Sequence, residues 1–146
     1  MPAESPLADI AHLIQLSVAP VFLLTGVGTS LGVFSTRLGR IVDRSRLLAE
    51  RLRGLAGAEA EQARIEVDLL LRRRRLVQLA ITCGTLAALM VAGVIGSAFL
   101  GFLLGWRVSG AVAFLFLAAV AFFMAALLLF LREVLIATAS AHAEHR

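Results

Sequence analysis

Three long stretches without a charged residue constrain this chain more than any other feature of its sequence. They contain no Asp, Glu, Lys or Arg, and they are Leu13–Thr36, Leu76–Trp106 and Val108–Leu131. Each exceeds the roughly 20 apolar residues with which a helix crosses a hydrocarbon core about 30 Å thick. The sequence therefore predicts an all-α integral membrane protein with three transmembrane helices.

The charged segment between the first two stretches predicts a helical hairpin. Residues 37–75 hold eleven of the fourteen basic residues, all of them arginine, together with six acidic residues. No helix breaker separates this segment from the first stretch, and Gly54–Gly57 is the only plausible turn within it. We predict one membrane domain, 1–146, in which a long antiparallel hairpin at about 37–75 separates the first two of three spans, at about 10–36, 76–100 and 109–132.

Apolar residues on the two arms of the hairpin alternate by three and four positions, which is typical of a coiled-coil seam. The predicted seam consists of Leu38, Ile41, Ser45, Leu48, Leu52 and Leu55 on the first arm, and of Ile65, Leu69, Arg72, Leu76 and Leu79 on the second. Complementary charges predict the register, with facing residues whose numbers sum to about 114. Arg46 then lies opposite Asp68, Glu50 opposite Arg64, and Arg53 opposite Glu61.

The distribution of arginine predicts the orientation. Eleven arginines lie between the first two spans, Arg107 alone lies between the second and third, and none precedes the first. Because short loops rich in basic residues stay in the cytoplasm, we expect the hairpin and C-terminus inside and the N-terminus outside a bacterial inner membrane. The basic excess lies beside membrane spans, so anionic lipid headgroups are the expected partner and nucleic acid is not.

The arginines at the base of the hairpin have two interpretations. The run Arg72–Arg75 either forms a lipid or phosphate site with Arg37, Arg40 and Arg44 across the hairpin, or anchors the spans by extending its side chains to headgroups. The candidates for a hairpin charge network or headgroup contact are Arg40, Asp43, Arg44, Arg72, Arg73, Arg74 and Arg75.

Small residues recur within the first two spans. Gly28 and Gly32, like Gly84 and Ala88, have the four-residue spacing that lets helices approach closely in lipid. We expect the first two spans to pack against each other through these faces, with a homo-oligomer interface as the alternative.

A polar stripe on the first span has a similar ambiguity. His12, Gln15, Thr25 and Thr29 would suit a pore lining, although threonine hydroxyls also bond back to helix carbonyls. No Asp or Glu lies inside a predicted span, so we expect no titrating group there for a proton or cation relay.

The sequence indicates no enzyme. It has no nucleophile–base pair, phosphate-binding loop or CxxC motif, and Asp9 with His12 is at most half a metal site. We therefore expect no catalytic residue, metal or cofactor. Two functional classes remain: a non-enzymatic structural or regulatory protein acting through the hairpin, and a homo-oligomeric channel or transporter whose pore is lined by the first helix.

Four segments carry a resemblance to a known family. They are Ile14–Leu24 with the glycines that follow, Arg37–Arg44, Arg73–Leu76 and Leu129–Val134. In these segments the chain resembles bacterial membrane proteins classified as domain of unknown function 2721, over roughly Ile10–Ile136. The resemblance implies the three-span layout and supplies no activity.

Overall fold

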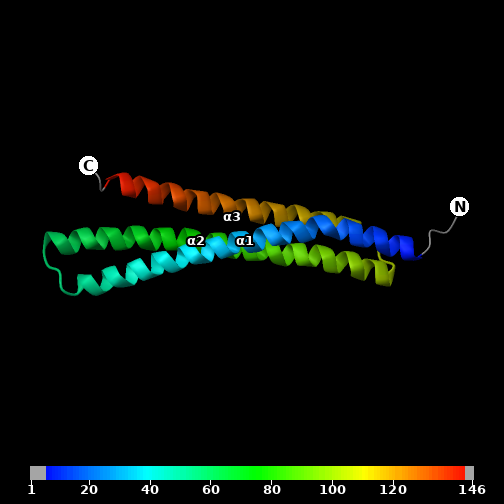
Figure 1. The fold of residues 1–146 in the computed structure, drawn as a ribbon, viewed down its shortest axis with the longest axis horizontal. Coiled ribbons are helices and arrows are strands. Elements are labelled where there is room, and N and C mark those ends of the chain that lie inside the picture. Colours follow the sequence, from blue (N-terminus) through cyan, green and yellow to red (C-terminus); the bar gives the residue numbers. More distant parts are fainter. Residues whose placement is uncertain (1–5, 144–146) are drawn as a thin grey trace. The chain divides into compact units, whose positions relative to one another are not determined.

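The computed structural model describes residues 6–143, with side chains from Ile14 to Thr138 except Leu16 and Ser17. This part of the chain forms helices and no strand (Figure 1). The helices are α1 (Pro6–Leu52), α2 (Ala58–Leu104) and α3 (Ser109–Ala143). The predicted all-α fold class is confirmed.

All three helices are long and apolar enough to cross a membrane, with candidate spans in Val18–Leu52, Ala58–Leu104 and Ser109–Thr138. The helices α1 and α2 contain 47 residues each. At 1.5 Å per residue each is about 70 Å long, more than twice the roughly 30 Å hydrocarbon thickness. Each therefore has room for a membrane span and a hairpin arm without a break, as expected for a multi-pass membrane protein.

Glycines with positive φ allow the chain to reverse between helices. Gly57 has φ of 66° at the start of α2, and Gly105 has φ of 67° at the end of α2. The Trp106 N–H donates to the Gly101 carbonyl over 2.9 Å, which closes α2 with a bond between residues five apart. The backbone at Gly101 also approaches the Val108 side chain so closely that an added Cβ would lie 2.3 Å from Val108 Cγ2.

The chain divides into two compact units, and each unit has buried residues from all three helices. Among the described residues, the first unit combines 6–30 with 84–123, and the second combines 31–83 with 124–143. In the first unit the buried side chains are small or medium-sized: Pro20, Val27, Ala87, Val91, Val94 and Ala119.

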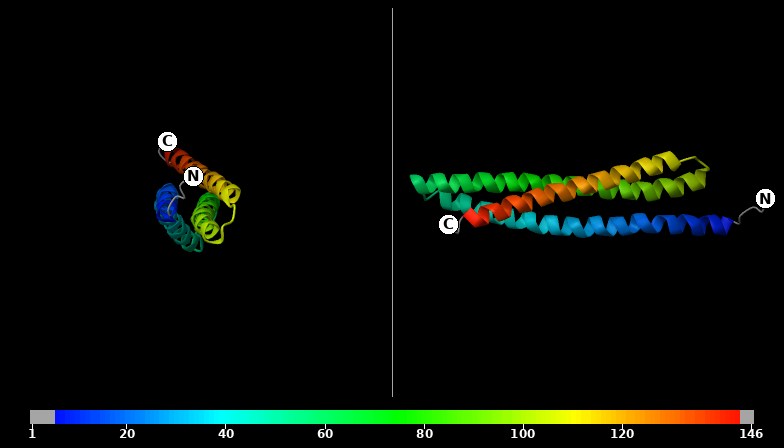
Figure 2. Two further views of the ribbon diagram at one scale, coloured as in Figure 1. Left: turned by 90° about the vertical axis from the view of Figure 1, so that its right-hand side faces the viewer. Right: turned by 90° about the horizontal axis from the view of Figure 1, so that it is seen from above.

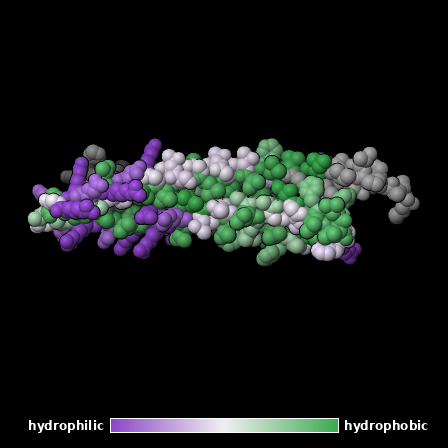
Figure 3. Space-filling model, turned by 90° about the horizontal axis from the view of Figure 1, so that it is seen from below, coloured by the Kyte–Doolittle hydropathy of each residue, from purple (hydrophilic) through white to green (hydrophobic). Residues whose placement is uncertain are grey.

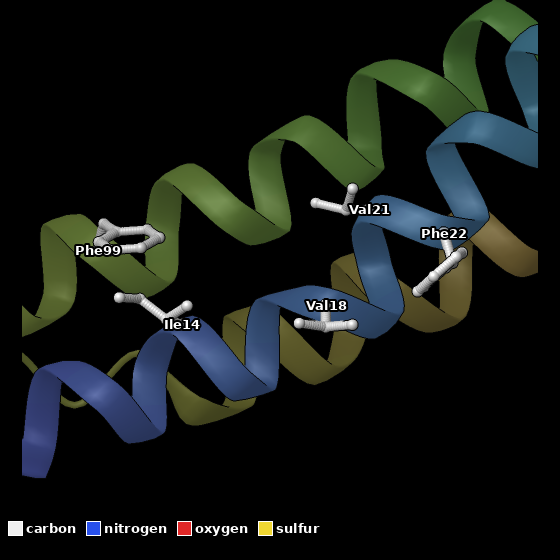
Figure 4. Close-up of a pocket in the computed structure, with 5 residues that line it drawn as sticks. All are labelled: Ile14, Val18, Val21, Phe22 and Phe99. Carbon is white, nitrogen blue, oxygen red and sulfur yellow. The ribbon is translucent and has the colours of Figure 1, made fainter.

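The first unit also carries an open apolar groove. Ile14, Val18, Val21 and Phe22 of α1 line it together with Phe99 of α2. Figure 4 shows Ile14 and Phe99 pointing toward each other across the space between these helices. The lining contains no ionisable side chain, so the groove offers contacts to apolar groups only.

The second unit contains the hairpin and a cluster of buried apolar side chains. Its core consists of Phe34, Ile41, Leu70, Val77, Ala80 and Ala126. Figure 1 and the right-hand view of Figure 2 show the two arms side by side, with opposite directions. On α1, Ile41 is buried and Leu38, Ser45, Leu48 and Leu52 are half-buried, as is Leu55 in the loop that follows. This burial agrees with the inward face predicted for this arm, whereas a coiled coil stays a prediction.

The predicted seam of the second arm is wrong. Ile65 is 57% exposed and Leu79 is 53% exposed, whereas Ala63, Leu70 and Val77 are buried. The buried residues do recur every seven positions, as predicted, but at other positions than the predicted ones. Every position of this arm has an apolar residue no more than two positions away, so the periodicity alone does not identify the buried face.

The predicted register is also wrong. The ion pair that crosses the hairpin joins Arg44 Nη2 to Glu66 Oε1 over 2.6 Å, and these residue numbers sum to 110. Arg46 and Asp68 form no ion pair in the described structure. The loop between α1 and α2 is centred on residue 55, so facing numbers must sum to about 110. Arg64 pairs instead within its own helix, with Glu61 at 3.6 Å.

Candidate functional site

Charged side chains gather over the hairpin, and apolar side chains cover most of the rest of the face shown in Figure 3. At the base of the hairpin, in the second unit, one acidic side chain is completely enclosed. Glu133 of α3 is 0% exposed, and among the described residues it is the one charged residue in the buried class.

Two arginines hold this carboxylate, one from each arm of the hairpin. Arg37 Nε of α1 donates to Oε2 over 2.6 Å, and Arg73 Nε of α2 donates to Oε1 over 2.9 Å. Hydrogen bonds between charged groups are shorter and stronger than neutral ones. All buried side-chain nitrogen and oxygen atoms in the described structure have partners. We call Arg37, Arg73 and Glu133 the buried triad.

Sequence spacing places the triad in the same packing layer. Arg37 lies three residues after buried Phe34 and four before buried Ile41, and Arg73 has the same relation to buried Leu70 and Val77. On α3, Ala119, Ala126 and Glu133 follow at intervals of seven, and all three are buried. Each helix therefore presents a charged residue at an inward position where the rest of the pattern is apolar.

Aromatic packing supports the Arg37 side of the triad. The rings of Phe34 and Phe130 lie 4.5 Å apart at 33°. The Arg37 guanidinium carbon lies 5.8 Å from the centre of the Phe130 ring, within the range of a cation–π contact. Phe130 is one turn before Glu133 on α3. The same helix thus supplies Arg37 with both a carboxylate and an aromatic face.

The triad carries a surplus of positive charge. Two guanidinium groups and one carboxylate give a formal charge of +2 − 1 = +1. A fully buried carboxylate is strongly destabilising unless it is paired, because the interior cannot replace its hydration. The arrangement can therefore bind the end of α3 to both hairpin arms, and it can attract an anion.

Glu133 lies just beyond the third predicted span, which ends at Arg132. The helix α3 continues past it with apolar Val134, Leu135 and Ile136. By length and composition, the helix from Ser109 to Thr138 is able to cross a membrane. The expectation that no acidic residue lies inside a span stays a prediction.

The structure separates the other candidates of the hairpin charge network. Arg73 belongs to the triad, and Arg44 pairs with Glu66. The remaining candidates are all exposed on the two arms: Arg40, Asp43, Arg72, Arg74 and Arg75. Asp43 takes part in none of the ion pairs of the described residues. The headgroup contact predicted for this set stays a prediction.

The small residues of the first two spans lie in different surroundings. Gly84 is buried and Ala88 is half-buried. Gly28 and Gly32 are exposed, and a Cβ added at either would meet no atom within 4 Å. These two glycines therefore lie at no helix contact within the chain, contrary to the expected packing of small faces against each other. A homo-oligomer interface at this face stays a prediction.

The predicted polar stripe is only partly described. Gln15, Thr25 and Thr29 are exposed, and the side chain of His12 lies outside the described residues. Thr25 donates to the Val21 carbonyl over 3.1 Å, and Thr29 donates to the Thr25 carbonyl over 3.0 Å. Both hydroxyls are thus satisfied by their own helix and need no polar neighbour in the membrane.

Comparison with known proteins agrees with the resemblance. Residues 17–143 match the family model described as "Protein of unknown function (DUF2721)". No curated protein and no solved structure matches the chain. The family match covers α2, α3 and all of α1 from residue 17 on, and it includes Arg37, Arg73 and Glu133. The chain therefore belongs to the family of proteins of unknown function named DUF2721.

Proposed function

We propose that this protein is a non-enzymatic structural or regulatory protein of the bacterial inner membrane that acts through its hairpin, on the cytoplasmic side. The observation that carries the proposal is the buried triad. Glu133 joins a membrane helix to both hairpin arms at once, so a displacement of α3 changes the support of both arms together.

Exposed apolar side chains on the arms indicate where a protein partner binds. Leu47 is 62% exposed and Ile65 is 57% exposed, and both lie in the charged hairpin. In the proposed topology they face water and not lipid. Contiguous exposed apolar patches rimmed by polar residues mark protein interaction sites, and we take Leu47 and Ile65 as parts of such a patch. We infer that the partner is a protein helix or a second hairpin that covers Leu47 and Ile65.

Photo-crosslinking in cells tests this proposal. A photoreactive amino acid replaces Leu47 or Ile65, and Gln62, which is also exposed on the hairpin, serves as the matched control position. We expect a discrete product at the two apolar positions and none at Gln62. The mass of the product separates a second copy from another protein. The same products at all three positions, or none at any, would contradict the proposal.

Coupling to α3 is tested in the same experiment. Glu133→Gln should reduce the yield of the product at Leu47, because the base of the hairpin loses its buried partner. Glu66→Gln, which removes an exposed ion pair, should leave the yield unchanged. If both variants give the wild-type yield, the hairpin binds a partner independently of α3, and the regulatory part of the proposal is wrong.

A further inference from the structure

The buried triad leaves most donors of its two arginines unused. A guanidinium has five N–H donors, and in the triad Arg37 and Arg73 each engage Glu133 through Nε. Within the described structure their Nη groups donate to no other protein group. Their side chains remain 34% and 20% exposed, respectively, although Glu133 between them is fully buried. A ligand can therefore reach both arginines while the carboxylate stays covered.

The position of the triad along the helices indicates which anion is nearby. Arg37 is the first charged residue after the uncharged stretch of α1, and Arg73 lies three residues before that of α2. Glu133 lies two residues after the uncharged stretch of α3. All three thus lie where an apolar span changes to polar sequence, which is the depth of lipid headgroups. The phosphate of an anionic lipid is the anion concentrated at that depth.

We propose that Arg37 and Arg73 form a binding site for the phosphate of one anionic phospholipid headgroup. Glu133 is the positioning residue, because it binds the Nε atoms and so holds both guanidinium groups in fixed orientations. The Nη groups are then available to bind the phosphate. The phosphate neutralises the surplus positive charge of the triad. Planar guanidinium groups bind phosphate oxygens in pairs, which a lysine ammonium does not reproduce.

This site differs from a general basic anchor. Exposed arginines such as Arg40 and Arg74 extend flexible side chains to any headgroup, and each contributes mainly through its charge. The two triad arginines are held in place before the lipid binds, so less side-chain entropy is lost on binding. The inference does not rest on the proposed role of the hairpin, because the lipid site requires neither a protein partner nor a displacement of α3.

Lysine substitutions test the site without changing its charge. The full-length protein in detergent micelles is titrated with phosphatidylglycerol, and native mass spectrometry measures the bound lipid. We expect Arg73→Lys and Arg37→Lys to weaken the binding of the first lipid about tenfold, because paired hydrogen bonds to the phosphate are lost. The matched controls Arg74→Lys and Arg40→Lys should bind within about twofold of the wild type, because those positions supply charge alone. Circular dichroism verifies the helical content of each variant.

Two further titrations identify the source of the phosphate. Phosphatidylcholine, whose headgroup has no net charge, should bind roughly tenfold more weakly than phosphatidylglycerol, because it leaves the surplus charge of the triad unbalanced. Inorganic phosphate at millimolar concentration should fail to displace the lipid. Equal binding by all four lysine variants would overturn the proposal, as would equal binding of the two lipids. Displacement by inorganic phosphate would overturn the assignment to a lipid.

Discussion

Replacement of Glu133 by glutamine is the most direct test of the buried triad. Glutamine preserves the shape of the side chain and one acceptor oxygen but places an NH2 donor against an arginine donor. The change removes one charge-assisted hydrogen bond, weakens the other and leaves donors facing each other. Each charge-assisted bond contributes about 1.5–3 kcal/mol.

The exposure of the two arginines moderates this effect. Their side chains are 34% and 20% exposed and can turn partly toward water when the carboxylate is lost. We therefore expect a loss near the lower end of the range for a broken buried pair, about 3 kcal/mol in free energy of unfolding. The measurement is a titration with sodium dodecyl sulfate in mixed micelles, followed by circular dichroism.

The chain provides a matched control for this measurement. Glu66→Gln removes the carboxylate of the Arg44–Glu66 pair, whose side chains are 63% and 36% exposed. Solvent screens such a pair, so the expected loss is below about 1 kcal/mol. If the two variants lose the same free energy within about 0.5 kcal/mol, Glu133 is not held as the structure indicates and the reasoning is refuted.

Three other changes test separate parts of the fold. Arg44→Glu should lower the free energy of unfolding of the hairpin, and adding Glu66→Arg should restore part of that loss. The expected coupling in a double-mutant cycle is about 0.5 kcal/mol, and a coupling of zero would contradict the register. Gly101→Ala should lower the thermal midpoint because the new Cβ would lie 2.3 Å from Val108 Cγ2, whereas Gly96→Ala, with no atom within 4 Å, should keep or raise it. Gly28→Leu or Gly32→Leu should shift the native mass toward the monomer with unchanged helicity, and a wild type that is already monomeric would exclude an oligomer interface at this face.

Hydropathy predicts the three helices, and the lack of a helix breaker between the first span and the hairpin predicts that α1 is continuous there; Pro20 lies inside α1 without ending it. The transition from Thr36 to Arg37 contains no residue that stops a helix, so the continuous α1 follows from the sequence. The sequence does not, however, predict which face each helix buries. Gly28 and Gly32 suggest a close helix contact, but Val27, Phe34 and Ile41 lie at intervals of seven on a different face, and these larger residues are the buried ones.

The sequence predicts only part of the candidate site. Arg37 and Arg73 stand out as part of a basic cluster, whereas Glu133 is easily missed because it follows Arg132. Next to each other at the end of a span, Arg132 and Glu133 have no net charge, and such a pair is expected to lie in solvent. The informative signal is the spacing of seven from Ala119 through Ala126 to Glu133, which places the carboxylate inside and not in solvent.

A charged layer at these inward positions specifies the register of the second unit. A shift of α3 by one heptad would place Ala126 against Arg37 and Arg73, and two cations would then lie half-buried without a carboxylate. Leaving a buried charge unpaired costs about 3–5 kcal/mol, and the partial exposure of the two arginines places their cost near the lower end of this range. The apolar layers discriminate much less, because Ala119 and Ala126 are identical residues at equivalent positions. The triad therefore distinguishes between arrangements that apolar packing alone would leave close in energy, as single polar residues do in coiled coils. Such a layer is useful in a membrane protein, where the hydrophobic effect does not drive one helix onto another.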